Sequence, residues 1–217
     1  METFSDRFAK GQTMFFRFFA DTFFAKRYGH RAVVLETIAG VPGMVAGMWI
    51  HLKSLRQMKT GYGPMIRDLL SEAENERMHL MFFLEIAKPS WPERILILIA
   101  QFVFWNYYFC LYVLSPRTAH KMIHFFEREA VASYQSYLDL IECGQISNVP
   151  APRLAIDYYD LPQDSRLSDM IREVLKDEER HAEANFFWAK MHSSNTLQNS
   201  GFTGTRTFQY TKNLANK

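Results

Sequence analysis

One spacing of glutamate and histidine occurs twice in the sequence, in Glu76-Arg-Met-His79 and, 102 residues later, in Glu178-Glu-Arg-His181. On an α-helix, side chains three residues apart project from the same face, one turn from each other. Each stretch therefore presents one carboxylate and one imidazole to a common point. Both groups bind transition metals, so the chemistry that this pattern indicates is metal ligation.

Two further glutamates, Glu36 and Glu127, stand alone in apolar-patterned segments. From Glu36 to Glu178 the glutamates follow one another at intervals of 40, 51 and 51 residues, which suits antiparallel helices of about 25 residues with their connections. A glutamate from each of two helices and a Glu-x-x-His pair from each of the other two form the ligand set of di-iron and di-manganese carboxylate bundles. Six oxygen and nitrogen ligands favour two iron ions over zinc or calcium.

Other acidic residues compete with this choice of ligands. A single Glu-x-x-His is usually an exposed pair on a charged helix. Chance is a poor explanation only because the pairs alternate with single glutamates, in the order Glu, Glu-x-x-His, Glu, Glu-x-x-His. The rival carboxylates are Glu72, Glu74, Glu85, Glu129, Glu179 and Glu183. Glu72 is the strongest, because it lies one turn before Glu76 on the same face. Asn75 and Asp177 each precede the glutamate of a pair and could hydrogen-bond a ligand.

The composition bounds the remaining possibilities. A chain of 217 residues suits one domain with a sizeable core. The net charge of +2 implies no strong field for nucleic acids, and we expect no nucleic-acid partner. Cys110 and Cys143 have neither a metal-binding spacing nor the pattern of a disulfide framework. No signal peptide or transit peptide is visible at the start of the sequence.

The hydrophobic periodicity predicts an all-α protein, a ferritin-like four-helix bundle with additional amphipathic helices. We expect a kink or tight packing in the segment from Gly40 to Gly43, which contains Pro42. The polar segment 193–217 is expected to be a flexible tail. The helices are predicted at 13–25, 31–60, 64–87, 95–114, 117–143 and 165–192, with a short helical or irregular stretch around Tyr158-Tyr159.

Residues 95–114 contain no formal charge over twenty positions, and hydropathy by itself predicts a transmembrane helix there. A crossing would place Glu76 and Glu127 on opposite sides of about 30 Å of hydrocarbon, although both must reach the same metals. We therefore predict that 95–114 and the aromatic helix 13–25 lie in one leaflet, as aromatic-rich interfacial segments do. The expected organisation is a membrane-associated arm over 1–30 and a bundle domain over 31–192 that includes helix 95–114.

Four segments resemble the ligand boxes of the alternative oxidases, a family of monotopic di-iron ubiquinol oxidases of respiratory membranes. The resemblance extends from about Lys26 to His192, and the most specific parts are 31–43 and 75–80. The four segments are Leu35-Glu36-Thr37, Asn75-Glu76-Arg77-Met78-His79-Leu80, Phe126-Glu127-Arg128-Glu129-Ala130 and Asp177-Glu178-Glu179-Arg180-His181. The family's third box usually reads Leu-Glu-Glu-Glu-Ala and its fourth more often has an acid in place of Arg180, but no presumed ligand is lost.

The resemblance implies a role for each site residue. Tyr134 matches a tyrosine that the family requires for catalysis, although a tyrosine seven residues after a ligand could also be core packing. His120 matches a histidine tied to quinol oxidation, and we group it with Asn75 and Asp177 as residues that support the ligands. The implied quinol pocket comprises Arg31, Leu35, Ala130 and Ser133. The implied ligands of two iron ions are Glu36, Glu76, His79, Glu127, Glu178 and His181.

The function that these observations predict is a non-heme quinol oxidase that reduces O2 to water without pumping protons and resists cyanide. The alternatives are a membrane di-iron quinone-ring hydroxylase and a non-enzymatic, ferritin-like iron-binding protein. The expected partners are ubiquinol, O2, the lipid of one leaflet and a second copy in a homodimer. The expected location is a respiratory membrane: bacterial if the chain is full length, mitochondrial if a presequence has been removed.

Overall fold

The computed structural model describes residues 3–24 and 28–193. The predicted tail falls outside these residues, as does the last residue of the predicted helix 13–25. Within the described residues the fold is all-α, and the helices are α1 (Phe4–Phe24), α2 (Tyr28–Gln57), α3 (Gly63–Ala87), α4 (Trp91–Leu114), α5 (Pro116–Glu142), α6 (Arg153–Tyr159) and α7 (Leu167–Ser193).

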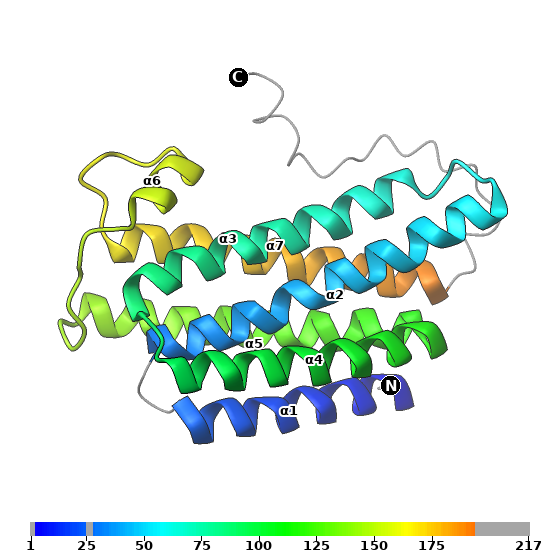
Figure 1. Ribbon diagram of the computed structural model, residues 1–217, viewed down its shortest axis with the longest axis horizontal. Coiled ribbons are helices and arrows are strands. Elements are labelled where there is room, and N and C mark those ends of the chain that lie inside the picture. Colours follow the sequence, from blue (N-terminus) through cyan, green and yellow to red (C-terminus); the bar gives the residue numbers. More distant parts are fainter. Residues whose placement is uncertain (1–2, 25–27, 194–217) are drawn as a thin grey trace.

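Helices α2, α3, α5 and α7 form the bundle, in which α2 packs along α3 and α5 packs along α7. Figure 1 shows α3 and α7 on one side of the molecule, α1 and α4 on the opposite side, and α2 and α5 between them. Helix α4 contacts α2 and α5, and α1 contacts α5. The prediction of an all-α helical bundle with additional helices is confirmed.

The buried apolar side chains form two clusters along the bundle. On α3, Met65 and Leu69 belong to one cluster, whereas Phe82 and Phe83 belong to the other. Glu76 lies on α3 between these two apolar ends and is fully buried. The core therefore encloses a polar middle section with apolar packing on either side.

Local signals at the helix ends explain two differences from the predicted bounds. Helix α4 begins at Trp91 instead of 95, because Ser90 and Glu93 form a capping box and Pro92 stands in the first turn. Helix α1 begins at Phe4 instead of 13. Thr3 and Asp6 cap its start, and the Thr3 amide donates a hydrogen bond of 2.8 Å to the Asp6 carboxylate.

Helix α2 continues without interruption through Pro42 and Gly43. A Cβ atom on Gly43 would lie 2.4 Å from the carbonyl oxygen of Leu69 and 3.0 Å from Ala73. Glycine is therefore needed here because α3 passes so close to α2. Of the two expectations for this segment, tight packing is what the structure has.

Among residues 3–24 and 28–193, two helices, α2 and α4, are long and apolar enough to cross a membrane. They differ in burial, because 67% of the apolar stretch of α2 is buried in the protein but only 22% of that of α4. Large apolar side chains are also exposed on α1. The exposed apolar side chains of α1 and α4 include Phe4, Met14, Phe15, Phe18, Trp91, Leu98, Ile99, Phe102, Val103 and Leu114.

Candidate metal centre and adjoining cavity

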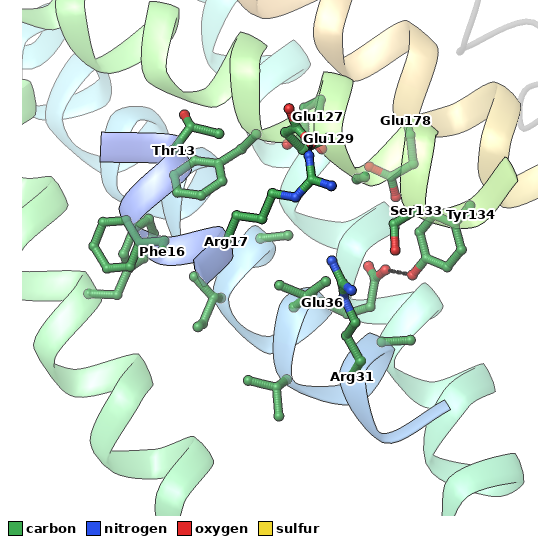
Figure 2. A pocket seen from close by; sticks show the side chains of 18 of the residues that line it. Thr13, Phe16, Arg17, Arg31, Glu36, Glu127, Glu129, Ser133, Tyr134 and Glu178 are labelled. Atoms are coloured by element: carbon green, nitrogen blue, oxygen red, sulfur yellow. Dashed lines mark hydrogen bonds and ion pairs between the residues drawn. The ribbon is translucent and has the colours of Figure 1, made fainter. Parts of the chain in front are cut away.

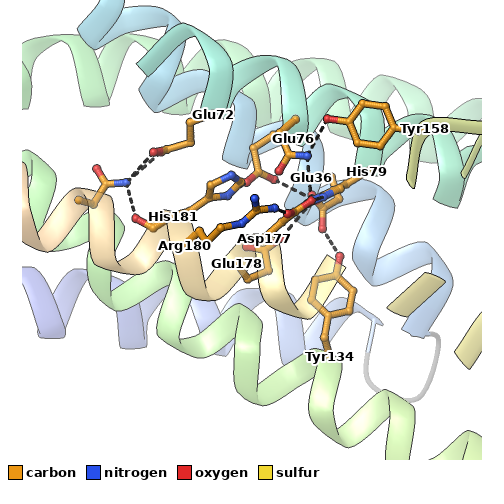
Figure 3. A network of polar contacts seen from close by, with 12 residues as sticks. Glu36, Glu72, Glu76, His79, Tyr134, Tyr158, Asp177, Glu178, Arg180 and His181 are labelled. Carbon is orange, nitrogen blue, oxygen red and sulfur yellow. Dashed lines mark hydrogen bonds and ion pairs between the residues drawn. The ribbon is translucent and has the colours of Figure 1, made fainter. Parts of the chain in front are cut away.

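The bundle brings the six predicted ligands together from its four helices. Figure 3 shows five of them, and Glu127 is labelled in Figure 2. Helix α2 supplies one of them, α5 supplies one, and α3 and α7 supply a Glu-x-x-His pair each. All six residues are buried, with exposed fractions of 7% or less. They are Glu36, Glu76, His79, Glu127, Glu178 and His181, and we call them the ligand cluster.

The cluster divides into two overlapping groups that could each hold one metal ion. In each group, one ligand atom per residue lies within 4.8 Å of all the others. One group contains Glu36 and His79, and the other contains Glu127 and His181. Glu76 and Glu178 belong to both groups. Two ions side by side could therefore share the carboxylates of Glu76 and Glu178.

The imidazole nitrogens face the carboxylates directly. His79 Nδ1 lies 3.4 Å from Glu36 Oε2, 3.6 Å from Glu76 Oε2 and 3.3 Å from Glu178 Oε1. His181 Nδ1 lies 2.5 Å from Glu76 Oε1. Both histidines thus present Nδ1 to the centre of the cluster.

The electrostatics of the cluster is that of buried negative charge. Burial and the neighbouring charge of Glu36 raise the pKa of Glu76 well above its usual value. Burial, with the charges of Glu76 and Glu36, raises the pKa of Glu178 to about 8. Burial and Glu178 likewise raise the pKa of Glu127 well above its usual value. Cations at the centre would favour the ionised carboxylates, because their positive charge would offset both the burial and the repulsion between neighbouring carboxylates.

The residues fit a pair of metal ions on geometry as well. Glu36 Oε2, Glu76 Oε2, Glu178 Oε1 and His79 Nδ1 are buried and lack a hydrogen-bond partner at normal geometry within the described part of the chain. Buried polar atoms are normally satisfied, so these atoms need a partner that the protein does not provide. Oxygen and imidazole donors in this ratio suit iron or manganese.

A hydrogen-bond network supports His79 from the side away from the cluster. Asn75 donates from Nδ2 to Asp177 Oδ2 at 2.9 Å, and that oxygen lies 3.2 Å from His79 Nε2. Tyr159 donates its hydroxyl to the same oxygen at 2.8 Å, and its oxygen lies 3.0 Å from His79 Nε2. Asn75 also donates to Tyr158. No sequence pattern marks either tyrosine, because both lie on the short helix α6, far along the chain from His79.

The strongest rival ligand, Glu72, lies beside the cluster and outside both metal-binding groups. Asn185 of α7 donates Nδ2 to both carboxylate oxygens of Glu72, at 2.9 and 3.0 Å. The other end of the amide, Oδ1, lies 2.9 Å from Nδ1 of His120. His120 is therefore connected to the cluster through Asn185, whose Nδ2 also donates to the backbone oxygen of His181 at 3.0 Å. Asn185 was missed because no motif marks it.

A cavity of about 290 Å³ adjoins the cluster (Figure 2). Its wall includes Glu36, Glu127 and Glu178 of the ligand cluster. Tyr134 also lines it and donates a hydrogen bond from its hydroxyl to Glu36 Oε1. The rest of the wall is mostly apolar and comes from α1, α2, α4 and α5. The four residues of the predicted quinol pocket, Arg31, Leu35, Ala130 and Ser133, all line this cavity.

Comparison with known proteins identifies the family. A family model described as alternative oxidase matches residues 1–190 of the chain. The chain belongs to the alternative oxidase family. The resemblance that the four ligand boxes indicated is thereby confirmed, because the match spans all of them.

Several alternative oxidases are about half identical to the chain. A mitochondrial ubiquinol oxidase of Mangifera indica is 51% identical over 185 residues, which are 85% of this chain and 58% of that protein. Alternative oxidase 3 of Glycine max, also mitochondrial, is 50% identical over 87% of this chain and 57% of its own length. Ubiquinol oxidase 2 of Nicotiana tabacum is 50% identical over 88% of this chain and 64% of its own length. The chain thus spans little more than half the length of these relatives.

Proposed function

We propose that the protein oxidises ubiquinol and reduces O2 to water. The observation that carries the proposal is the cavity, because three carboxylates of the ligand cluster form part of its wall. A substrate in the cavity would lie directly against the groups that hold the metals. A ferritin-like iron store needs no such apolar cavity, and a quinone-ring hydroxylase has no support in the names of the relatives.

The six residues of the ligand cluster would hold two iron ions. When bound, they supply the redox chemistry that carries electrons from quinol to O2. The protein supplies ligands, dryness and orientation. Asp177 Oδ2 lies 3.2 Å from His79 Nε2, and this contact holds the imidazole so that Nδ1 faces the cluster.

The quinol ring would lie between Arg31 and Ser133, whose polar groups face the cavity beside Glu36 (Figure 2). Its apolar tail would follow the wall formed by α1 and α4. Tyr134 stands at the inner end with its hydroxyl on Glu36. A phenol in that position can pass a proton between the quinol and the carboxylate, and burial raises the pKa of Tyr134 well above its usual value, which keeps the phenol protonated at rest.

The exposed apolar side chains of α1 and α4 support association with one leaflet of a membrane. The cavity is bordered by both helices, so that quinol can enter from the lipid. In this proposal residues 1–30 form the membrane arm and 31–192 the oxidase domain. Because quinol and O2 react at one site on one side, no proton crosses the membrane. The location is the mitochondrial or the bacterial inner membrane.

A homodimer is also part of the proposal. A second group of exposed apolar side chains lies on α2 and α3, and comprises Met44, Met48, Leu52, Leu55 and Leu70. Such a patch on a protein already attached to lipid suits contact with a second copy.

The decisive experiment is oxygen uptake by the purified protein with a short-chain ubiquinol in detergent, with and without cyanide. We expect about two iron ions per chain by metal analysis and uptake that persists at cyanide concentrations sufficient to stop heme oxidases. Iron binding without any quinol-dependent uptake would favour the iron-binding alternative. Uptake with formation of a hydroxylated quinone would favour the hydroxylase.

A further inference from the structure

Three acidic side chains recur every four residues along α3, namely Asp68, Glu72 and Glu76. Side chains at this spacing lie one above another on the same helix face, about 6 Å apart along the axis. Glu76 belongs to the ligand cluster, Glu72 is buried one turn before it, and Asp68 is partly exposed a further turn away. A row of carboxyl groups therefore extends along α3 from the partly exposed Asp68 to the cluster.

Glu72 is held in a way that leaves both of its protonation states accessible. Burial lowers the pKa of His120 to about 3, so this imidazole is neutral at physiological pH. Its Nδ1–H can donate to Asn185 Oδ1, which turns the amide nitrogen of Asn185 toward Glu72. Because an amide carries no charge, it does not lock the carboxyl group in its ionised form as an arginine would.

The charges around this row set its acidity. Burial raises the pKa of Glu72 to about 7, against the opposing effect of the charge of His181, and burial raises the pKa of Asp68 to about 6. Both values lie close to neutral pH, where a group exchanges protons most readily. The titratable groups that act on Glu72 or are acted on by it are Asp68 and Glu76 on α3, Tyr108 on α4, Glu127 on α5 and His181 on α7.

The row approaches the cluster from the side opposite the cavity. Figure 3 shows Glu72 and Tyr134 at opposite ends of the cluster, with Glu72 beyond His181. Helices α3 and α7, which carry Glu72 and its partner Asn185, lie on the side of the molecule away from α1 and α4 (Figure 1). If α1 and α4 face lipid, the helix that carries Asp68 lies on the opposite side of the molecule, and Asp68 itself is partly exposed.

We propose that Asp68 and Glu72 form a proton path between the aqueous medium and the ligand cluster, separate from the quinol cavity. The proposal rests on the proposed oxidase function. Two quinols release four electrons and four protons, and one O2 accepts four electrons and four protons to give two molecules of water. The path lets the four protons for water formation come from the medium at Asp68, through Glu72. The four protons from quinol then return to the medium from the cavity side, so that uptake and release balance.

The first test removes quinol as a proton source. The iron-loaded protein is reduced anaerobically with dithionite and mixed with O2 in a stopped-flow instrument. Glu72→Gln should slow reoxidation at least about tenfold and increase the solvent deuterium isotope effect, since a proton-transfer residue contributes at least that much. Asp68→Asn should slow it less, because water can partly replace a group near the surface. The control Glu85→Gln, an exposed position on the same helix, should match the wild type.

The second test needs no turnover. In the resting iron-loaded protein, infrared spectroscopy should show a protonated carboxyl band near neutral pH that is absent from Glu72→Gln. After transfer to D2O, the deuterium shift of this band should be slower in Asp68→Asn than in the wild type.

Unchanged reoxidation in Glu72→Gln, or equal exchange rates of the band in Asp68→Asn and the wild type, would overturn the path. If Glu72→Gln fails to retain iron, the exchange rate in Asp68→Asn decides. Failure of the oxidase function would appear separately, as a wild-type protein that consumes no O2 with ubiquinol.

Discussion

At the residue scale, the two Glu-x-x-His pairs and the two single glutamates form a candidate metal site because they are buried together. Glu76 and Glu178 are each shared by the two metal-binding groups, whereas Glu72 belongs to neither. Glu72 is hydrogen-bonded to Asn185 instead. The distinction between a shared ligand and a neighbouring acid can be tested by metal binding.

Glu76→Ala and Glu178→Ala should each lose most of the iron, because both candidate ion sites lose a carboxylate at once. The measurement is iron per chain by elemental analysis after purification. Glu74→Ala is the matched control, since Glu74 is exposed on α3 and paired with Arg77. Full iron content in both variants would mean that other glutamates are the ligands, and Glu72 would be the first to examine.

We expect Tyr134 to have a role in turnover that an assay of metal binding would not reveal. Tyr134→Phe removes the hydroxyl that bonds Glu36 but keeps the ring that stacks on Phe83. We expect normal iron content and a loss of turnover of about 10²-fold or more, the usual contribution of a proton-transfer group. Tyr137→Phe is the control, because Tyr137 also lines the cavity on α5. A fully active Tyr134→Phe variant would mean that Tyr134 contributes only to the packing of the core.

At the element scale, the contact between α2 and α3 depends on glycine. Gly43→Ala would push a methyl group to 2.4 Å from the carbonyl oxygen of Leu69. Overpacking typically costs about 1–3 kcal/mol, which exceeds the roughly 1 kcal/mol that alanine gains over glycine in a helix. The midpoint of urea unfolding should therefore fall.

Gly11→Ala, in α1, is the matched control for this prediction. No atom lies within 4 Å of a Cβ built on Gly11. Its substitution should leave the unfolding midpoint unchanged or raise it, because only helix propensity changes. Equal effects of the two substitutions would mean that the α2–α3 approach is not tight in solution.

The orientation of α4 is the second prediction at this scale. The cluster requires α3 and α5 on the same side of the membrane, so α4 between them should lie in one leaflet. Cysteines introduced at Lys88 and Ser136, in a Cys110→Ser and Cys143→Ser background, should react equally with an impermeant maleimide in sealed vesicles of one orientation. Both positions are exposed in the structure. Labelling from opposite sides would contradict a single metal centre.

At the scale of the whole molecule, the buried carboxylates link stability to pH and to metal. The folded pKa of Glu178, about 8, lies above its ordinary value of 4.5. Between these values the folded protein retains a proton that the unfolded chain has released. This contribution to stability is fully present below pH 4.5 and is lost as the pH rises through 8. Bound iron replaces the proton and should reverse the trend.

We therefore expect the metal-free protein to unfold at lower urea concentration at about pH 8.5 than at about pH 7.5. Glu178→Gln should flatten this dependence. His120, whose pKa burial lowers to about 3, acts in the opposite direction, but only below its ordinary value of 6.5. Measuring above that value separates the two effects. A metal-free protein whose stability rises over this range would contradict the prediction.

Much of the candidate site follows from the sequence because helix geometry is local. Three-residue spacing places Glu76 beside His79, and Glu178 beside His181, on any α-helix. The order and spacing of the four glutamates then imply antiparallel helices, and the all-α bundle confirms that inference. Apolar periodicity likewise predicted most helices, with errors at Phe4 and Trp91, where capping residues outside the apolar pattern begin the helix earlier.

Only the tertiary structure determined which distant side chains meet. Asn185 bonds Glu72 across 113 positions, and Tyr159 lies against His79 across 80. Such contacts depend on how helix faces pack and leave no periodic trace in the sequence. The same holds for the cavity, which four helices form together. Sequence by itself determined which groups could do chemistry here, because the helical repeat is a property of the backbone. Packing decided which of them share a site.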